Sequence, residues 1–439
     1  MKVSASVIKK IHKPPTRMYR YFGIFVFIFL VFVSEVYWRE GLYDISEEFI
    51  TYFQKNVYEN FKKLLKLIDL VEYYPLILFG LLIVYNICNI YKTFILMSVL
   101  HFSWGLSALL KMAYINPRPF YSHQDITAYI CKAGWGNPSD NAIIFTSFVL
   151  TFWKVIFEYP ILKEYKKVRI CCLGFGILIL LTTYMTSILT GNNSINQILF
   201  GACIGFSIYF FVFYIMGVDL YDSKQFIRFI KAKYLWNILL YLVILIAGIL
   251  LYYCRKLDND LENLFEVRIS IDCPGTPEIQ RLHKEALIEL IYSCTFIAAI
   301  IALKVEFKMF TSNSNDDKLE KKWRDNNFDS AINEDEEQFD SRKSIFINTT
   351  TQWNHTNTVF TVVRIFVSCI LTFVIYIPSI FIKYDSNIVL VIIMKILLPM
   401  ILFYISLFYL FKAVFRVFKL GNFSANLLIA IQEPLRSEN

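Results

Sequence analysis

The sequence predicts an all-α polytopic membrane protein of about ten transmembrane helices. Of its 439 residues, 56% are hydrophobic and only 18% are charged, and the mean hydropathy is +0.48. Soluble globular domains carry more charge, about a quarter of their residues. The apolar residues also fall in runs of about 20, the length that a helix needs to cross the hydrocarbon core of a bilayer.

The first expected span is the apolar run 21–36, which follows a basic segment, residues 1–20. No small-residue cleavage site follows it, so we expect a retained signal-anchor span whose preceding cations hold the N-terminus in the cytoplasm. Further spans are expected at residues 74–91, 93–111, 142–158, 169–190, 195–216, 234–254, 285–304, 358–382 and 387–412.

The basic residues between the spans agree with this count. Alternating sides from a cytoplasmic N-terminus puts the cations of residues 163–169, 224–233 and 412–419 in the cytoplasm, as the positive-inside rule requires. The C-terminus falls on the same side. We expect an integral protein of the endoplasmic reticulum or another internal membrane, with residues 111–141 and 186–197 facing the lumen. The scattered cations also argue against nucleic acid as a partner.

Several segments are too polar to span. Residues 46–70 place apolar side chains at helical spacing, which predicts an amphipathic helix in the membrane interface, and segment 21–73 would combine it with the first span. Residues 217–304 would hold additional spans around a non-cytoplasmic loop. Residues 305–357 are highly charged and predict a disordered cytoplasmic loop, and residues 358–439 would add two spans and a short tail.

The nine cysteines form no metal or redox motif. Most lie inside apolar segments, where cysteine behaves as a small hydrophobic residue. Cys254 and Cys273 flank one loop, and two alternatives stay open for them: a disulfide in an oxidising lumen, or two free thiols. We expect neither a cofactor nor a metal.

Lys111 and Arg118 lie where an apolar helix should end. Seven residues separate them, close to two helical turns, so they would project from nearly one face while the helix persists. Pro117 and Pro119 would then stop the helix. Two cations at a membrane face suit a phosphate, whereas the simpler interpretation is interfacial anchoring by snorkelling.

Two further polar stretches share the expected lumenal side with this pair. Gly134 to Asn141 precedes one span, and Thr186 to Gln197 connects two others. Each stretch is unspecific alone, but their order and spacing together are specific.

Together the stretches resemble the signature of the type 2 phosphatidic acid phosphatase superfamily. This family includes lipid phosphate phosphatases, sphingosine-phosphate phosphatases and glucose-6-phosphatase, and its signature is Lys-x6-Arg-Pro, then Pro-Ser-Gly-His, then Ser-Arg-x5-His-x3-Asp. Lys111, Arg118 and Pro119 match the first block. The resemblance covers about residues 75–216 and implies a six-helix phosphatase-like core in the segment 74–216.

The other two blocks depart from the signature. In the second block Pro138 and Ser139 match, but Asp140 replaces glycine and Asn141 replaces histidine. In the third block the departures are Thr186 for Ser, Ser187 for Arg, Asn193 for His and Gln197 for Asp. The glutamine matters little, because glucose-6-phosphatase-like members also carry it.

The resemblance implies what these departures remove. In the family, the third-block histidine is the nucleophile, the second-block histidine protonates the leaving alcohol, and the lysine and two arginines hold the phosphate oxygens. A carboxamide is neither basic nor titratable near neutral pH, so Asn193 and Asn141 cannot take these roles. Ser187 also lacks the bidentate clamp of an arginine. We therefore expect no intact catalytic residue at Asn141, Ser187, Asn193 and Gln197. For Lys111, Arg118 and Ser139 two alternatives stay open: a phosphate-binding remnant, or residues that persist from the history of the fold or cap the end of the helix.

Two residues are candidates for a relocated active site. His123 follows Arg118 closely, but a lone loop histidine is usually a solvated surface residue. Asp140 adjoins Ser139, but its carboxylate would repel phosphate and pair with Lys111 instead. His101, inside an expected span, should be a hydrogen-bonded packing residue.

These observations favour a catalytically inactive member of the family that binds phosphorylated lipid headgroups or scaffolds membrane proteins. One alternative is an active phosphatase that acts on a phosphorylated lipid or sugar through a non-standard site. A third option is a transporter or channel, which has little support because, apart from His101, the expected spans show few ionisable residues. The expected partners are membrane lipids and other membrane proteins.

Overall fold

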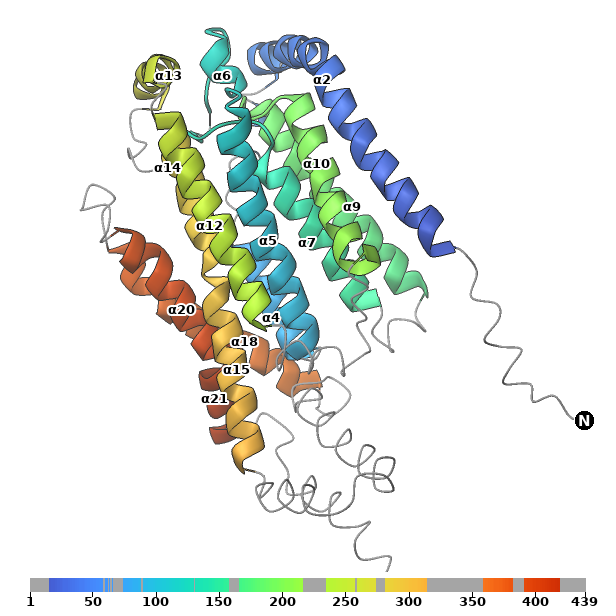
Figure 1. The fold of residues 1–439 in the computed structure, drawn as a ribbon, viewed down its shortest axis with the longest axis vertical. Helices are drawn as coiled ribbons and strands as arrows, with labels where there is room; N and C mark the ends of the chain where they lie inside the picture. Colours follow the sequence, from blue (N-terminus) through green and yellow to red (C-terminus); the bar gives the residue numbers. More distant parts are fainter. Residues whose placement is uncertain are drawn as a thin grey trace, which may run out of the picture.

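The structure is a computed structural model, and it describes residues 16–57, 60–61, 63, 65, 74–87, 90–129, 131–157, 166–215, 234–256, 259–273, 281–313, 358–381 and 391–418. These residues form helices and their connections, with no strand among them. Figure 1 shows the helices as one elongated bundle. The predicted all-α polytopic fold is confirmed.

Eight helical stretches in the described part of the chain are long and apolar enough to cross a membrane. They correspond to eight of the ten expected spans: Lys92–Ser122, Asp140–Phe157, Lys167–Leu189, Ile195–Tyr214, Tyr234–Cys254, Leu282–Val305, Val359–Pro378 and Ile392–Phe415. Of the other two, the expected span 74–91 is a shorter apolar helix, Ile77–Ile87. The expected first span lies within a longer helix, and most of its side chains are outside the described set.

That longer helix is α2 (Thr16–Asn56), which joins two elements that the sequence analysis separated. The stretch after the first apolar run contains no proline, and its one glycine, Gly41, is tolerated in the helix. The C-terminal part of α2 crosses the top of the bundle in Figure 1. Its polar side chains bind protein there: Ser46 Oγ accepts a hydrogen bond from Ile195 N at 2.8 Å, and Gln54 Nε2 donates to Thr127 O at 3.1 Å. The expected amphipathic helix thus lies on neighbouring loops; beyond residue 57 it falls largely outside the described residues.

The centre of the bundle is α5, which packs against helices from both halves of the sequence. It contacts α4, α7 and α10 on the N-terminal side and α12, α14 and α15 on the C-terminal side. Its Leu96, Met97 and Ala108 are buried because neighbours surround the helix. The core elements are α4 (Tyr74–Ile87), α5 (Ile90–Tyr114), α6 (Pro119–Ser122), α7 (Asp140–Phe157), α9 (Lys166–Leu189), α10 (Ile195–Phe210) and η1 (Phe211–Ile215).

The C-terminal helices are therefore part of the same packed body as the core. In Figure 1 α14 runs beside α5, and α13 lies at the top near α6. Helix α15 continues to Asn313, into the segment expected to be a loop, and the rest of that loop lies outside the described residues. The C-terminal elements are α12 (Tyr234–Lys256), α13 (Asn259–Asp272), α14 (Leu282–Cys294), α15 (Phe296–Asn313), α18 (Thr358–Ile380), η5 (Ile392–Leu397), α20 (Leu398–Ile405), η6 (Ser406–Leu410) and α21 (Phe411–Val417).

Candidate functional site: a buried charge cluster around Lys111

The three polar stretches found in the sequence meet at one end of the bundle. Backbone hydrogen bonds join them: Gly136 N donates to Asn116 O at 2.9 Å, and Ser139 N donates to Gln197 O at 3.1 Å. The second loop is also held by α2, because Asn137 Nδ2 donates to Glu35 Oε1 at 2.7 Å. Residues far apart in sequence thus form a single site.

Arg118 lies inside this site and is fully buried. Helix α5 ends at Tyr114, and Pro119 begins the short helix α6, so Arg118 sits at a fixed corner of the chain. Its Nε donates to Gly134 O at 2.7 Å, and its Nη1 donates to Asn192 O at 3.0 Å. The guanidinium therefore ties the second stretch to the third.

Asn193, at the position that resembles the family nucleophile, is held by both ends of its amide. Its Nδ2 donates to Gly136 O at 2.9 Å and to Gln197 Oε1 at 3.3 Å, and its Oδ1 accepts from Arg118 Nη1 at 3.5 Å. Gln197 in turn donates from Nε2 to Pro117 O at 2.8 Å and closes a capping box with Ser194 at the start of α10. Both amides connect loops.

The position that resembles the general acid makes a similar contact. Asn141 Nδ2 donates to Ser187 Oγ at 3.3 Å, so the two residues that replace a histidine and an arginine of the signature face each other. Ser139 Oγ accepts from Ala142 N at 3.4 Å in the first turn of α7. These side chains stabilise the ends of α7 and α9.

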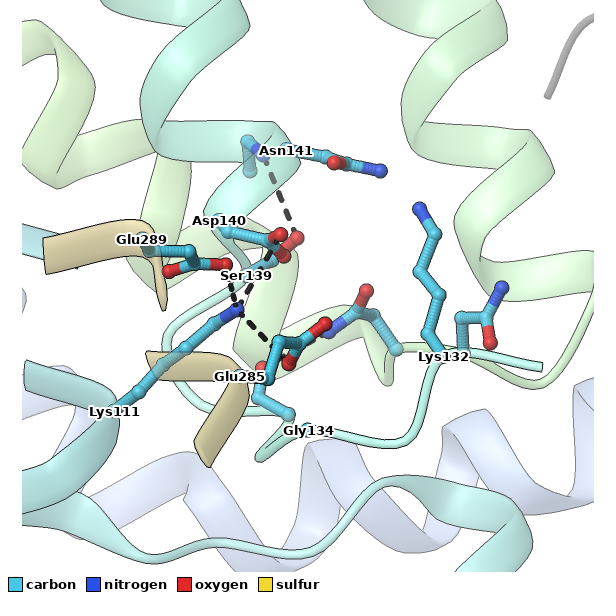
Figure 2. A network of polar contacts seen from close by, with 12 residues as sticks. Lys111, Lys132, Gly134, Ser139, Asp140, Asn141, Glu285 and Glu289 are labelled. Atoms are coloured by element: carbon cyan, nitrogen blue, oxygen red, sulfur yellow. Dashed lines mark hydrogen bonds and ion pairs between the residues drawn. The ribbon is translucent and has the colours of Figure 1, made fainter. Parts of the chain in front are cut away.

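Lys111 is the centre of a buried charge cluster, which we define as Lys111, Arg118, Asp140, Glu285 and Glu289. Figure 2 shows the lysine reaching from α5 towards carboxylates from two other helices. Its Nζ lies 2.8 Å from Glu289 Oε1, 3.3 Å from Asp140 Oδ2 and 3.7 Å from Glu285 Oε2. The lysine side chain is 0% exposed, and Glu289 is 11% exposed.

Buried charges of one sign are tolerated only when opposite charges lie beside them. In the cluster, three carboxylates face two cations, so the positive charge expected to attract a phosphate is already balanced by the chain itself. Lys132 is also buried and lies near the cluster (Figure 2). The pairing of Lys111 with Asp140, expected from the sequence, is confirmed.

The two candidates for a relocated active site, Asp140 and His123, lie in different surroundings. Asp140 belongs to the cluster, whereas His123 faces α2: its Nδ1 lies 2.5 Å from Glu47 Oε1, and its ring lies beside that of Tyr43. His101 is confirmed as a packing residue, because its ring stacks on Phe296 and its Nδ1 lies 3.1 Å from Tyr292 O.

The two glutamates of the cluster were not predicted from the sequence. Glu285 and Glu289 are one helical turn apart on α14, so they share a face. The available signal was their spacing at the start of an apolar helix, since ionisable residues in a membrane span mark functional positions. The few ionisable residues of the expected spans thus include Glu285, Glu289 and the fully buried Arg364 of α18, none of which was singled out from the sequence.

The cysteine alternatives are also corrected. Cys273, at the end of α13, forms a disulfide with Cys131, in the loop before Gly134, and the two Cα atoms are 5.6 Å apart. Cys254, at the end of α12, is a free and exposed thiol. The sequence neighbours do not pair because α13 packs against α6, which brings Cys273 to the loop of Cys131.

Comparison with known proteins finds one family model, and the segment that it matches contains the three polar stretches of the site. Residues 77–220 match the family model described as the PAP2 superfamily. No curated protein and no solved structure matches the chain. The matched segment runs from α4 to just beyond η1 and includes Lys111, Arg118 and Asn193. The chain thus carries, over residues 77–220, a domain of the PAP2 superfamily, the type 2 phosphatidic acid phosphatases.

Proposed function

We propose that this protein is a catalytically inactive, lipid-phosphatase-like integral membrane protein that acts by binding lipids or membrane proteins. The observation that carries the proposal is the environment of Asn193. Its amide oxygen faces Arg118 and its amide nitrogen is held by Gly136 and Gln197, so the side chain serves as a structural link. An amide in this position offers no nucleophile to a phosphorus atom.

The remaining groups of the site support the same conclusion. The transfer of a phosphoryl group through a covalent intermediate needs a nucleophile on one side of the phosphorus and an acid for the leaving oxygen on the other. Asn141 donates to Ser187, and neither group titrates near neutral pH. Asp140 is an ionisable group in the right region, but its carboxylate is engaged by Lys111.

The alternative of an active phosphatase would need His123 or Asp140 as a relocated catalytic group. His123 is directed at Glu47 and Tyr43 of α2, and its side chain is 28% exposed, as a surface residue would be. The inactive interpretation is therefore favoured over a relocated site.

An assay of the purified full-length protein tests the proposal. We expect no turnover of phosphatidic acid, sphingosine phosphate or glucose 6-phosphate above that of a mock purification. Lys111→Ala and Arg118→Ala serve as controls, because a contaminating phosphatase would be unaffected by either change. Turnover that disappears in both variants would show that the protein is an enzyme.

The proposal includes a location in an internal membrane such as the endoplasmic reticulum, with both termini in the cytoplasm and the site facing the lumen. The disulfide between Cys131 and Cys273 supports a lumenal site, because it lies at this end of the bundle and disulfides persist in oxidising compartments. The outward apolar side chains of α12 and α18, such as Trp236, Val243, Val362 and Phe366, support contact with lipid.

A further inference from the structure

We infer that helix α14 is a built-in occupant of the anion site: Glu285 and Glu289 take the place of a phosphate at Lys111 and Arg118. The site accepts a phosphate group only when these carboxylates are neutralised or move away. This inference rests on the proposed function in one respect, namely that Lys111 and Arg118 are taken as the phosphate-holding pair of the domain.

The position of one oxygen atom is the first argument. Glu285 Oε2 lies 3.7 Å from Lys111 Nζ and 3.8 Å from Arg118 Nη2. A single carboxylate oxygen thus faces both cations of the Lys-x6-Arg block, as an oxygen of a bound phosphate would. Glu289 adds a shorter contact to Lys111, at 2.8 Å.

The second loop is shaped to admit this carboxylate. A Cβ atom on Gly134 would lie 1.3 Å from Glu285 Oε2, so any larger side chain at this position would force the carboxylate to move. The carbonyl of Gly134 accepts the hydrogen bond from Arg118 Nε, so the same residue positions the arginine and leaves room for the glutamate. Figure 2 shows Glu285 directly above Gly134.

The start of α14 is fixed against that loop. Leu282 N donates to Ala133 O at 2.7 Å, and Trp135 Nε1 donates to His283 Nδ1 at 3.1 Å. The disulfide between Cys131 and Cys273 also joins this loop to the end of α13, the helix that precedes α14. These contacts hold α14 where its carboxylates reach the cations. The arrangement of the backbone therefore places Glu285 and Glu289 beside Lys111 and Arg118.

Charge decides between the carboxylates and an external anion. A phosphate monoester carries up to two negative charges, and carboxylates at contact distance from the same cations repel it. The three carboxylates of the cluster balance Lys111, Arg118 and the nearby Lys132, so no net positive charge remains to attract the anion. With Glu285 and Glu289 uncharged, Lys111 and Arg118 outnumber Asp140, and a phosphate group gains a net attraction.

The test compares the wild-type protein with the double variant Glu285→Gln/Glu289→Gln in nanodiscs of neutral lipid. Glutamine keeps the size and hydrogen-bonding capacity and removes the charge. The midpoint of thermal unfolding is followed while inorganic phosphate is added in one arm and while phosphatidic acid is built into the nanodisc in the other, because a ligand that binds the folded state raises this midpoint. Stabilisation by phosphate alone identifies a soluble anion as the ligand, and stabilisation by phosphatidic acid alone identifies a lipid headgroup.

We expect no saturable shift in the wild type and a saturable shift in the double variant, with at least about tenfold tighter apparent binding. Lys111→Met added to the double variant should abolish the shift. Glu266→Gln, on α13, is the matched control for the loss of a glutamate charge and should behave as the wild type.

Two results would overturn the inference: phosphate binding by the wild type as tight as that of the double variant, or a folded double variant that gains no binding in either arm. Size-exclusion chromatography establishes folding. If the double variant does not fold, Glu285→Gln alone decides, because Glu285 supplies the one oxygen that faces both cations and its side chain, 21% exposed, tolerates the change better. A folded Glu285→Gln protein that binds phosphate no better than the wild type would then overturn the inference. The two failures are distinguishable: phosphate binding by the wild type without turnover refutes this inference alone, whereas wild-type turnover that disappears in Lys111→Ala and Arg118→Ala refutes the proposed inactivity as well.

Discussion

Lys111 is the residue on which the charge balance of the site depends. It is the shared partner of Asp140, Glu285 and Glu289, and no part of its side chain reaches solvent. Removal of one member of a buried ionic group leaves the others without compensation, which costs more than the group contributed. The ion pairs of Lys111 therefore hold carboxylates of α7 and α14 together.

Lys111→Met should therefore destabilise the protein strongly. Methionine has a similar length but no charge, so the buried Asp140 and Glu289 would lose the cation that they share. We expect a loss of about 3–5 kcal/mol in the free energy of unfolding. Chemical unfolding in detergent, followed by tryptophan fluorescence, measures it.

Lys55→Met on the exposed face of α2 is the matched control, and it should change the free energy of unfolding by less than about 0.5 kcal/mol. A loss below about 1 kcal/mol for Lys111→Met would show that the cluster does not depend on the lysine.

At the scale of elements, α13 and the disulfide connect the C-terminal half to the loop that carries Gly134 and Trp135. Cys131 and Cys273 are separated by 142 residues in the sequence, so the bond closes a long loop of chain. Cross-links of this kind stabilise mainly by restricting the unfolded state. The position of α14 beside the cations depends on this connection as well as on side-chain packing.

We expect Cys131→Ser to lower the free energy of unfolding by about 2–4 kcal/mol under non-reducing conditions and to have no further effect once a reductant is present. Cys254→Ser, which removes a free and exposed thiol, is the control and should leave stability unchanged. Peptide mapping should recover Cys131 linked to Cys273; a link from Cys273 to Cys254 would contradict the arrangement.

At the scale of the whole molecule, the proposed topology has a direct test in the loop after α6. Asp125 is exposed and is followed by Ile126 and Thr127, so Asp125→Asn completes an acceptor triplet for N-glycosylation. We expect this variant to carry one glycan more than the wild type, seen as a glycosidase-sensitive shift on a gel, because the loop should face the lumen.

The natural triplets at Asn348 and Asn354 provide the opposite expectation. They fall in the charged loop expected in the cytoplasm, so Asn348→Gln and Asn354→Gln should leave the gel mobility unchanged. A shift in either variant, or the lack of a glycan on Asp125→Asn, would contradict the proposed topology.

The spans and the meeting of the three motifs were predictable because their signals are local. The length of an apolar run predicts a span. The pairing of Lys111 with Asp140 was predictable because the two opposite charges lie in motifs that the resemblance brings to one site. The spacing of Glu285 and Glu289 could have marked them as candidates, but their contact with Lys111 and the bond from Cys273 to Cys131 were not predictable. Both depend on how α13 and α14 return to the core from more than 100 residues away. The continuity of α2 was missed because the amphipathic and apolar parts of that helix were assigned to different environments.

The origin of α14 late in the chain also affects how the protein is made. Lys111 and Glu289 are separated by 178 residues, and at synthesis rates of about 5–20 residues per second the glutamate emerges about 10–40 s after the lysine. Until then, Asp140 is the one carboxylate of the cluster that has been synthesised to pair with Lys111. A chain that ends before residue 285 would therefore hold Lys111 and Arg118 with Asp140 as the single carboxylate of the cluster.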